Sequence, residues 1–138
     1  MTINFKCVVD ASVGIKQFVP DPLCNKVNQL FSLLTNANCQ LYVPDLFYIE
    51  CTNIFWKYVR AGQYAAVDVQ QDLASLKAFP LNVVPTANLI EDAASIAIEH
   101  NISAYDASYI ALSQQVDASL LTMDLRLVRN FASTSYNV

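Results

Sequence analysis

Glycine and histidine are scarce in this sequence, and their scarcity excludes several kinds of active site. The chain has two glycines, Gly14 and Gly62, and neither belongs to a G-x-G-x-x-G or G-x-x-x-x-G-K-[ST] motif. Dinucleotide sites and P-loop nucleotide sites need such loops, because the backbone must approach phosphate closely. His100 is the only histidine and no G-x-S-x-G is present, which argues against nucleophilic triads. We expect His100 to lie at the end of a helix, where an imidazolium suits the helix dipole.

Paired cysteines, export signals and excess basic charge are also missing. No C-x-x-C spacing occurs, so we expect reduced, buried cysteines rather than a zinc site at Cys7, Cys24, Cys39 and Cys51. The N-terminus has no signal-peptide pattern and no uncharged apolar run could span a bilayer, so we expect a cytoplasmic protein. A net charge of -4 argues against a protein that holds nucleic acid by electrostatics alone. It does not exclude a nuclease, because bound divalent cations would supply positive charge.

What the sequence does contain indicates one α/β domain over residues 1–138. At this length, with 54% hydrophobic residues, the chain can bury one core without disulfides. Short apolar, β-rich runs predict strands at Phe5–Val9, Gln40–Val43, Leu81–Val84 and Leu120–Thr122. Apolar spacing predicts helices at Leu23–Ala37, Asp45–Ala61, Val67–Ala78, Leu89–Glu99, Tyr105–Val116 and Leu125–Phe131. This alternation predicts a three-layer α/β/α fold with a central parallel sheet, whose strands are buried on both faces.

Three aspartates stand at junctions between these expected elements. Asp10 directly follows the first strand and Asp124 follows the last, and ligand sites in such sheets lie outside the carboxyl ends of the strands. Asp106 comes three residues after Ser103, which is the spacing of a capping box. Helix capping is sufficient to explain each of these acids taken alone, and the nearby Ser12 as well.

Glu50 lies on the one narrow polar stripe of an otherwise apolar helix. Projected at 3.6 residues per turn, that helix carries its polar residues together: Glu50, Asn53, Lys57 and Arg60. The stripe is equally well explained as the solvent-facing side of the helix or as the wall of a polar cleft.

The joint pattern of acids predicts more than any single member does. Asp10, Glu50, Asp106 and Asp124 can converge on one pocket, where their mutual repulsion would raise their pKa values unless a cation neutralised it. Oxygen ligands of this kind suit Mg²⁺ or Mn²⁺. Such an ion can activate water and stabilise the leaving oxygen in the hydrolysis of a phosphodiester.

The same residues resemble the PIN-domain family, and the compact length resembles its VapC-type toxin ribonucleases. The resemblance covers essentially the whole domain and is carried by Val8-Val9-Asp10-Ala11-Ser12, Pro44…Glu50, Ala104-Tyr105-Asp106-Ala107-Ser108-Tyr109-Ile110-Ala111-Leu112 and Leu121-Thr122-Met123-Asp124. It implies a Mg²⁺- or Mn²⁺-dependent endoribonuclease that acts on RNA, is usually dimeric, and is held inactive by a small antitoxin. By the same resemblance, the four acids match the family's acidic quartet, and Ser12 and Thr122 match its accompanying hydroxyls. The chain departs from the family in its scarcity of basic residues, which bears on RNA affinity and substrate range.

Other kinds of protein share parts of this pattern. A receiver-type phosphoacceptor needs an Asp at the end of its third strand, where this chain has Pro85, and an adhesion module would want serine at the position of Gly14. A catalytically inactive PIN-like interaction domain is the main alternative, although the intact quartet argues against it.

Several aromatic residues on one helix are candidates for a surface at which the chain associates with other proteins. Phe47, Phe55, Trp56 and Tyr58 all belong to the helix expected at Asp45–Ala61. They predict a homodimer and a helical antitoxin segment packed against this helix or its neighbours, or else an unusually aromatic core.

Overall fold

Four parallel strands form the central sheet in the computed structural model, which describes residues 4–138. They are β1 (Phe5–Val9), β2 (Cys39–Pro44), β3 (Asn82–Val84) and β4 (Ser119–Leu121). The strand order is β3-β2-β1-β4, and Val8 of β1 pairs with Tyr42 of β2 on one side and Leu120 of β4 on the other. The expected parallel sheet is therefore confirmed, with β1 and β2 at its centre.

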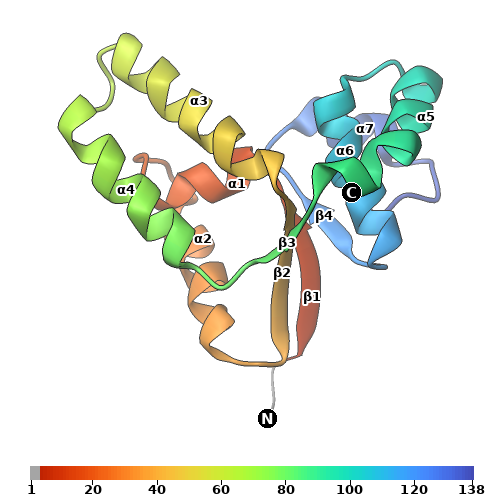
Figure 1. The fold of residues 1–138 in the computed structure, drawn as a ribbon, viewed down its shortest axis with the longest axis horizontal. Coiled ribbons are helices and arrows are strands. Elements are labelled where there is room, and N and C mark those ends of the chain that lie inside the picture. Colours follow the sequence, from red (N-terminus) through yellow and green to blue (C-terminus); the bar gives the residue numbers. More distant parts are fainter. Residues whose placement is uncertain (1–3) are drawn as a thin grey trace.

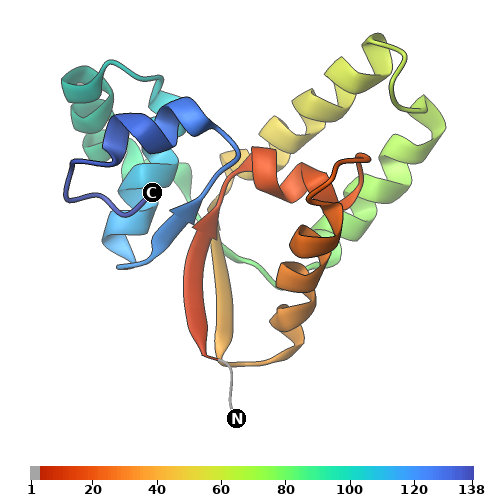
Figure 2. The same ribbon diagram turned by 180° about the vertical axis from the view of Figure 1, so that it is seen from behind.

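Helices cover both faces of this sheet. In the described chain they are α1 (Ala11–Gly14), α2 (Cys24–Ser32), α3 (Leu46–Arg60), α4 (Ala66–Ala78), α5 (Ile90–His100), α6 (Ala104–Gln115) and α7 (Leu125–Phe131), with 3-10 turns at Ile15–Gln17, Leu33–Thr35 and Thr86–Leu89. Figures 1 and 2 show α1 to α4 on one side of the sheet and α5 to α7 on the other, with α3 and α4 forming an antiparallel arm. The predicted three-layer α/β/α fold is confirmed.

Two helix predictions differ from the structure near the N-terminus. The helix expected at Leu23–Ala37 ends at Ser32 and tightens into the turn Leu33–Thr35, after which Asn36 is extended. Such tightening is common at helix ends, where the last carbonyls lack i+4 partners. The second difference is α1, for which no residue range was predicted, because four residues are too few for apolar periodicity to appear.

The prediction that every strand is buried on both faces is wrong at β3. This strand has three residues and lies at one edge of the sheet, and its Val83 is 46% exposed. An edge strand pairs on one side only, so its apolar residues need not be covered on both faces. At the opposite edge, the Leu120 amide of β4 donates to the Asn137 carbonyl at 2.9 Å, so the C-terminal segment pairs there.

Helix α6 is the most deeply buried helix of the C-terminal side. It packs against β1 and β2 beneath and against α5 above, so that every residue from 107 to 113 is buried. On the other face, Phe47 and Phe55 of α3 are fully buried, whereas Trp56 is 53% exposed. Two of the four aromatic side chains that suggested an interface, those of Phe47 and Phe55, therefore belong to the core.

Helix α1 packs closely on α3 through a glycine. A Cβ atom at Gly14 would lie 2.6 Å from Cζ of the buried Phe47, which is closer than real Cβ contacts allow. Gly14 is therefore required by a close approach between two elements. Because α1 follows Asp10 directly, this contact also fixes where the end of β1 lies relative to α3.

Smaller predictions agree with the structure in most cases. The cysteines are reduced thiols, and Cys7, Cys39 and Cys51 are buried, while Cys24 is only partly covered. His100 is the last residue of α5, where its ring packs 4.6 Å from the Phe131 ring. Across the described part of the chain, the helices are too short or too polar to cross a membrane.

Candidate active site

Four carboxylates line one cavity at the carboxyl ends of the strands. The cavity has a volume of about 170 Å³, and its walls include Asp10, Glu50, Asp106 and Asp124, together with Ala11, Ser12, Ile54 and Tyr109. The structure thus brings together four acids that are up to 114 positions apart in the sequence, the separation of Asp10 and Asp124.

The topology of the sheet explains this convergence. Strands β1 and β4 are neighbours, and the Asp10 amide donates to the Leu121 carbonyl at 3.2 Å, so Asp10 and Asp124 follow adjacent strand ends. Helix α3 begins directly after β2 and brings Glu50 over the same edge. Helix α6 packs on β1 and β2 and presents Asp106 from its first turn.

Asp10 is buried and held by several donors. The residue is 8% exposed, and its Oδ1 accepts hydrogen bonds from the Ser12 hydroxyl at 2.5 Å and from the Val13 amide at 3.2 Å. The Thr122 hydroxyl is a further hydrogen-bond partner. Asp10 therefore caps α1, as one interpretation of the sequence expected, and it also forms part of the cavity wall.

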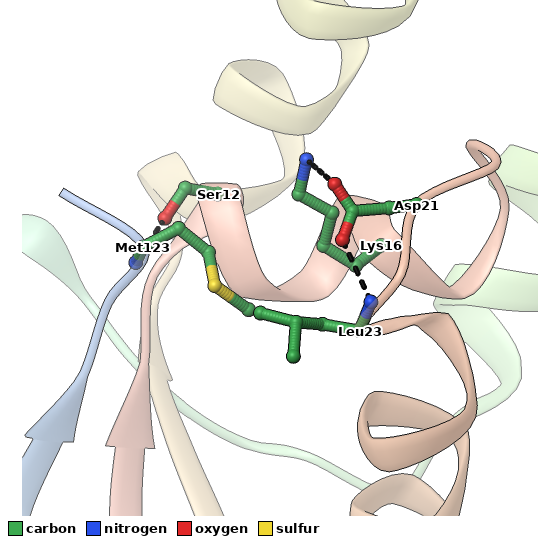
Figure 3. Close-up of polar contacts among 5 residues, drawn as sticks. All are labelled: Ser12, Lys16, Asp21, Leu23 and Met123. Atoms are coloured by element: carbon green, nitrogen blue, oxygen red, sulfur yellow. Dashed lines mark hydrogen bonds and ion pairs between the residues drawn. The ribbon is translucent and has the colours of Figure 1, made fainter.

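Ser12 joins the ends of two strands across the cavity floor. While donating to Asp10, its hydroxyl oxygen accepts a hydrogen bond from the Met123 amide at 3.0 Å, and this bond is drawn in Figure 3. The Asp124 amide in turn donates to the Thr122 hydroxyl at 3.1 Å. The two hydroxyl residues named from the sequence therefore connect the segment after β1 to the segment after β4.

The segment that follows α1 is fastened by an ion pair. Lys16 Nζ lies 2.9 Å from Asp21 Oδ2, and Asp21 Oδ1 accepts a hydrogen bond from the Leu23 amide at 2.8 Å (Figure 3). In the same view the Leu23 and Met123 side chains lie end to end. Both belong to an apolar groove of about 240 Å³ between α2 and the end of β4.

Glu50 is held by a residue that the sequence did not single out as functional. The buried Tyr109 hydroxyl donates to Glu50 Oε1 at 2.6 Å, while Oε2 has no hydrogen bond from a described residue. Tyr109 lies three residues after Asp106, so the two share a face of α6. That i, i+3 spacing is the signal by which sequence reasoning could have found it.

Asp106 and Asp124 each combine a capping arrangement with a place in the cavity. The Asp106 amide donates to the Ser103 hydroxyl at 3.1 Å, which is the expected N-cap of α6. Asp124 Oδ1 caps α7 by accepting from the amides of Arg126 and Leu127, and its Oδ2 has no partner among the described residues. Each of these two aspartates therefore takes part in a helix cap and also lines the cavity.

Burial and mutual repulsion raise the pKa values of three of the acids. Loss of solvent is the largest cause for Asp10, Glu50 and Asp106. The charge of Asp106 adds to the rise in pKa of Asp10 and Glu50, and the charge of Asp124 adds to that of Asp106. The charge of Arg126 lowers the pKa of Asp106 as a lesser effect.

The donor chemistry of the cavity fits a hard divalent cation. Its ionisable groups include four carboxylates with hydroxyls beside them and no thiolate or imidazole, which is the set that Mg²⁺ and Mn²⁺ prefer. Within residues 4–138, however, no three acidic, histidine or cysteine side chains stand close enough to ligate one ion as they are placed. The four carboxylates line the cavity but, as they are placed, stand too far apart for three of them to ligate one ion.

Two larger hollows adjoin the acidic cavity. A groove along α3 contains Asn53, so the structure places this residue beside Glu50 rather than among the four acids. A polar pocket of about 350 Å³ shares Asp106 and Asp124 with the cavity and contains Arg126, which the sequence had not indicated. The polar stripe of α3 therefore serves in part as a cleft wall, at Glu50, Asn53 and Lys57, and in part as exposed surface, at Arg60.

Comparison with known proteins finds a family model and a relative that span most of the chain. The family model described as the PIN domain matches residues 7–131. Ribonuclease VapC3 of Pyrobaculum aerophilum is 31% identical over 128 residues, which cover 91% of this chain and 95% of that protein.

Two solved structures share the fold. The crystal structure of PAE2754 from Pyrobaculum aerophilum has a TM-score of 0.73 at 20% identity and covers 99% of this chain and 91% of its own. A toxin-antitoxin complex from Klebsiella pneumoniae has a TM-score of 0.60 at 17% identity, with coverages of 96% and 99%.

Proposed function

Because this chain belongs to the PIN domain family, we propose that it is a Mg²⁺- or Mn²⁺-dependent endoribonuclease and the toxin of a toxin–antitoxin pair. The observation that carries the proposal is the convergence of Asp10, Glu50, Asp106 and Asp124 on one cavity. The similarity to a protein named as a ribonuclease supports RNA as the substrate. The fold shared with a toxin-antitoxin complex supports a small antitoxin as the partner.

The four carboxylates would hold the cation, which also removes the repulsion between them. When bound, the ion supplies charge stabilisation for the phosphodiester and lowers the pKa of a water molecule. Asp10 is the most firmly placed of the four, because Ser12, Val13 and Thr122 all donate to it. The other three must approach it on binding, since the described side chains do not yet form a ligand set.

We assign to Glu50 the role of taking the proton from the attacking water. Burial is the largest cause that raises its pKa, and a raised pKa moves a carboxylate toward the range useful for a general base. Tyr109 holds Oε1 and so directs the free Oε2. Tyr109 remains the donor in this pair because burial and the charge of Glu50 raise the pKa of its hydroxyl.

The surfaces around the cavity suit the expected partners. The apolar groove between α2 and the end of β4, which contains Leu23, Val27 and Met123, suits the apolar face of an antitoxin helix. For the homodimer, α5 offers an exposed stripe of Ile90, Ala94 and Ile98 at i, i+4, i+8 spacing. An enzyme that acts on RNA and pairs with an antitoxin would work in the cytoplasm.

The alternative function is a catalytically inactive PIN-like interaction domain. It would bind a cation and a partner without turnover. The complete quartet, the hydroxyls that hold Asp10 and the Tyr109–Glu50 bond all favour the enzyme, because a binding module has no need to hold a half-buried carboxylate with a raised pKa.

Cleavage of RNA tests the proposal. The purified protein should cleave RNA with Mg²⁺ or Mn²⁺ and stop in excess chelator, and Asp10→Asn and Asp124→Asn should abolish turnover while remaining folded. Asp45→Asn is the matched control, because Asp45 follows β2 but is exposed and bonds to Thr86 outside the cavity. Cleavage that persists in chelator, or in either site variant, would refute the mechanism.

A further inference from the structure

A groove with exposed aromatic walls runs beside the acidic cavity. It lies between α3 and the first turn of α6 and encloses about 740 Å³. Its walls include Ile49, Asn53, Trp56, Lys57 and Tyr105. This volume is within the range of ligand sites in proteins, which is roughly 300–1,000 Å³.

Its aromatic side chains are not part of the core. Trp56 is 53% exposed and Tyr105 is 65% exposed, whereas Phe47 and Phe55 of the same helix as Trp56 are fully buried. The guanidinium of Arg60 lies 5.3 Å from the centroid of the Trp56 ring. The fold therefore leaves flat aromatic faces in the groove, one of them already in contact with a cation.

The groove is continuous with the proposed active site. Glu50 and Ile54 line both the groove and the acidic cavity. A molecule lying in the groove would therefore reach the four acids without crossing another element.

The chemistry of the groove suits a nucleobase better than an apolar protein segment. Exposed aromatic rings bind unpaired bases by stacking, and this stacking tolerates any base because each has a π face. Lys57 and Arg60 supply two cations beside the rings in a chain of net charge -4, and the amide of Asn53 can bond to a base edge. A purely apolar partner would leave these polar groups without partners.

We propose that this groove is the subsite for an unpaired nucleobase of single-stranded RNA, stacked on Trp56 and Tyr105 next to the phosphodiester that is cleaved. The inference rests on the proposed function and extends it, because it assigns the residues of this chain that hold a base beside the cleaved phosphodiester. A base in a duplex is stacked on its neighbours and cannot enter the groove.

The sequence provides a direct probe of this subsite, because Trp56 is the only tryptophan. Its fluorescence is measured in the Asp124→Asn variant with Mg²⁺, since Asp124 does not line the groove and the variant should not cleave. The probes are a short unstructured oligoribonucleotide and the fully paired duplex of the same sequence. The single strand should quench the emission saturably, and the duplex should leave it nearly unchanged.

Binding of labelled RNA to substituted proteins gives a second readout. Trp56→Ala and Tyr105→Ala should each weaken binding of the single strand by about 5- to 150-fold, which is the range expected for losing one stacked base. Trp56→Phe should restore most of the affinity because it keeps an aromatic face. Val67→Ala is the control, since Val67 is an exposed apolar residue of α4 outside the groove. In the active enzyme, Trp56→Ala should raise KM more than it lowers kcat.

Three results would overturn the inference. Unchanged Trp56 emission at saturating RNA, in a protein whose wild type cleaves RNA, would remove the subsite while leaving the proposed function intact. Emission that changes with protein concentration alone would show that a second copy of the chain covers the groove. Absence of both cleavage and binding would refute the proposed function first and the subsite with it.

Discussion

At the scale of single residues, the acids of this site have two physical roles at once. Asp10 and Asp124 cap helices with Oδ1, yet both also face the cavity. Sequence reasoning offered capping and catalysis as alternatives, and the structure makes them compatible, because strands of such a sheet lead into helices at the edge where ligands bind. A cap also orients a carboxylate, since its amide donors fix one of the two oxygens.

Asp106 provides a test that separates repulsion from capping. Its pKa is raised above 3.8 by burial and by the charge of Asp124, so the folded protein binds the proton more tightly than the unfolded chain does. Tighter proton binding by Asp106 stabilises the folded protein fully below pH 3.8. This stabilisation is lost as the pH rises through the raised pKa of Asp106. In chelator, Asp106→Asn should therefore keep or raise the melting temperature at neutral pH, with a difference that disappears toward acid.

The same variant should show a smaller rise in melting temperature on adding Mg²⁺. Loss of one carboxylate should weaken Mg²⁺ binding, and a cation that binds the native state more weakly stabilises it less. Asp45→Asn is a control of opposite sign. Hydrogen bonds from Thr86 lower the pKa of Asp45, so this substitution should lower the midpoint at neutral pH and leave the Mg²⁺ shift unchanged. If Asp106 only caps α6, its substitution should cost a few tenths to about 1 kcal/mol and leave the metal response intact.

At the scale of elements, the sequence predicted most of the architecture because strand and helix order sets the topology. The alternation of apolar runs and helical patterns was enough to place Asp10 and Asp124 at one edge of a parallel sheet. It could not give the bounds of α1, whose four residues are shorter than any periodic pattern, nor the exposure of β3, which depends on its place at the edge. Both depend on which elements become neighbours in the folded chain.

The contact between α1 and α3 gives a prediction at this scale. Gly14→Ala should destabilise the protein by about 1–3 kcal/mol, because the added methyl group would overlap the buried ring of Phe47. The double variant Gly14→Ala/Phe47→Leu should recover part of this loss, because leucine lacks the ring atoms that are overlapped. Equilibrium unfolding in urea measures both changes.

Gly62→Ala is the comparison for that experiment. Gly62 has a φ of +73°, and no atom beyond its chain neighbours lies within 4 Å of the place that a Cβ would occupy. Alanine there would be strained by its backbone and not by packing. Adding Phe47→Leu should therefore give no rescue at Gly62. Equal rescue at both glycines, or no loss of stability in Gly14→Ala, would contradict the packing account.

At the scale of the whole molecule, the fold assembles functional pairs that sequence spacing cannot show. Glu50 and Tyr109 are 59 positions apart and meet only because α3 and α6 converge over the ends of the strands. Asp10 and Asp124 could be named from their positions after strands, and Asp106 and Glu50 from helix patterns. The aromatic groove and the Arg126 pocket could not be named, since they arise between elements. Surface association likewise depends on which apolar residues the core leaves uncovered.

The exposed stripe on α5 predicts how two copies of the chain associate. Wild-type protein should sediment as a dimer at micromolar concentration, and Ile98→Asp should shift it to monomer, because Ile98 is 83% exposed in the single chain and a dimer would bury the new charge. Val67→Asp is the control on α4 and should leave the dimer intact. A wild-type monomer, or a dimer unaffected by Ile98→Asp, would refute this interface.

Carboxylates from four elements are proposed to act as one cation site. Calorimetric titration with Mn²⁺ tests it most directly, because it requires neither RNA nor turnover. We predict saturable binding to the wild type, at least about tenfold weaker binding to Asp10→Asn, Asp106→Asn and Asp124→Asn, and unchanged binding to Asp45→Asn. Wild-type protein that binds no Mn²⁺ saturably, or site variants that bind it as tightly as the wild type, would contradict the account.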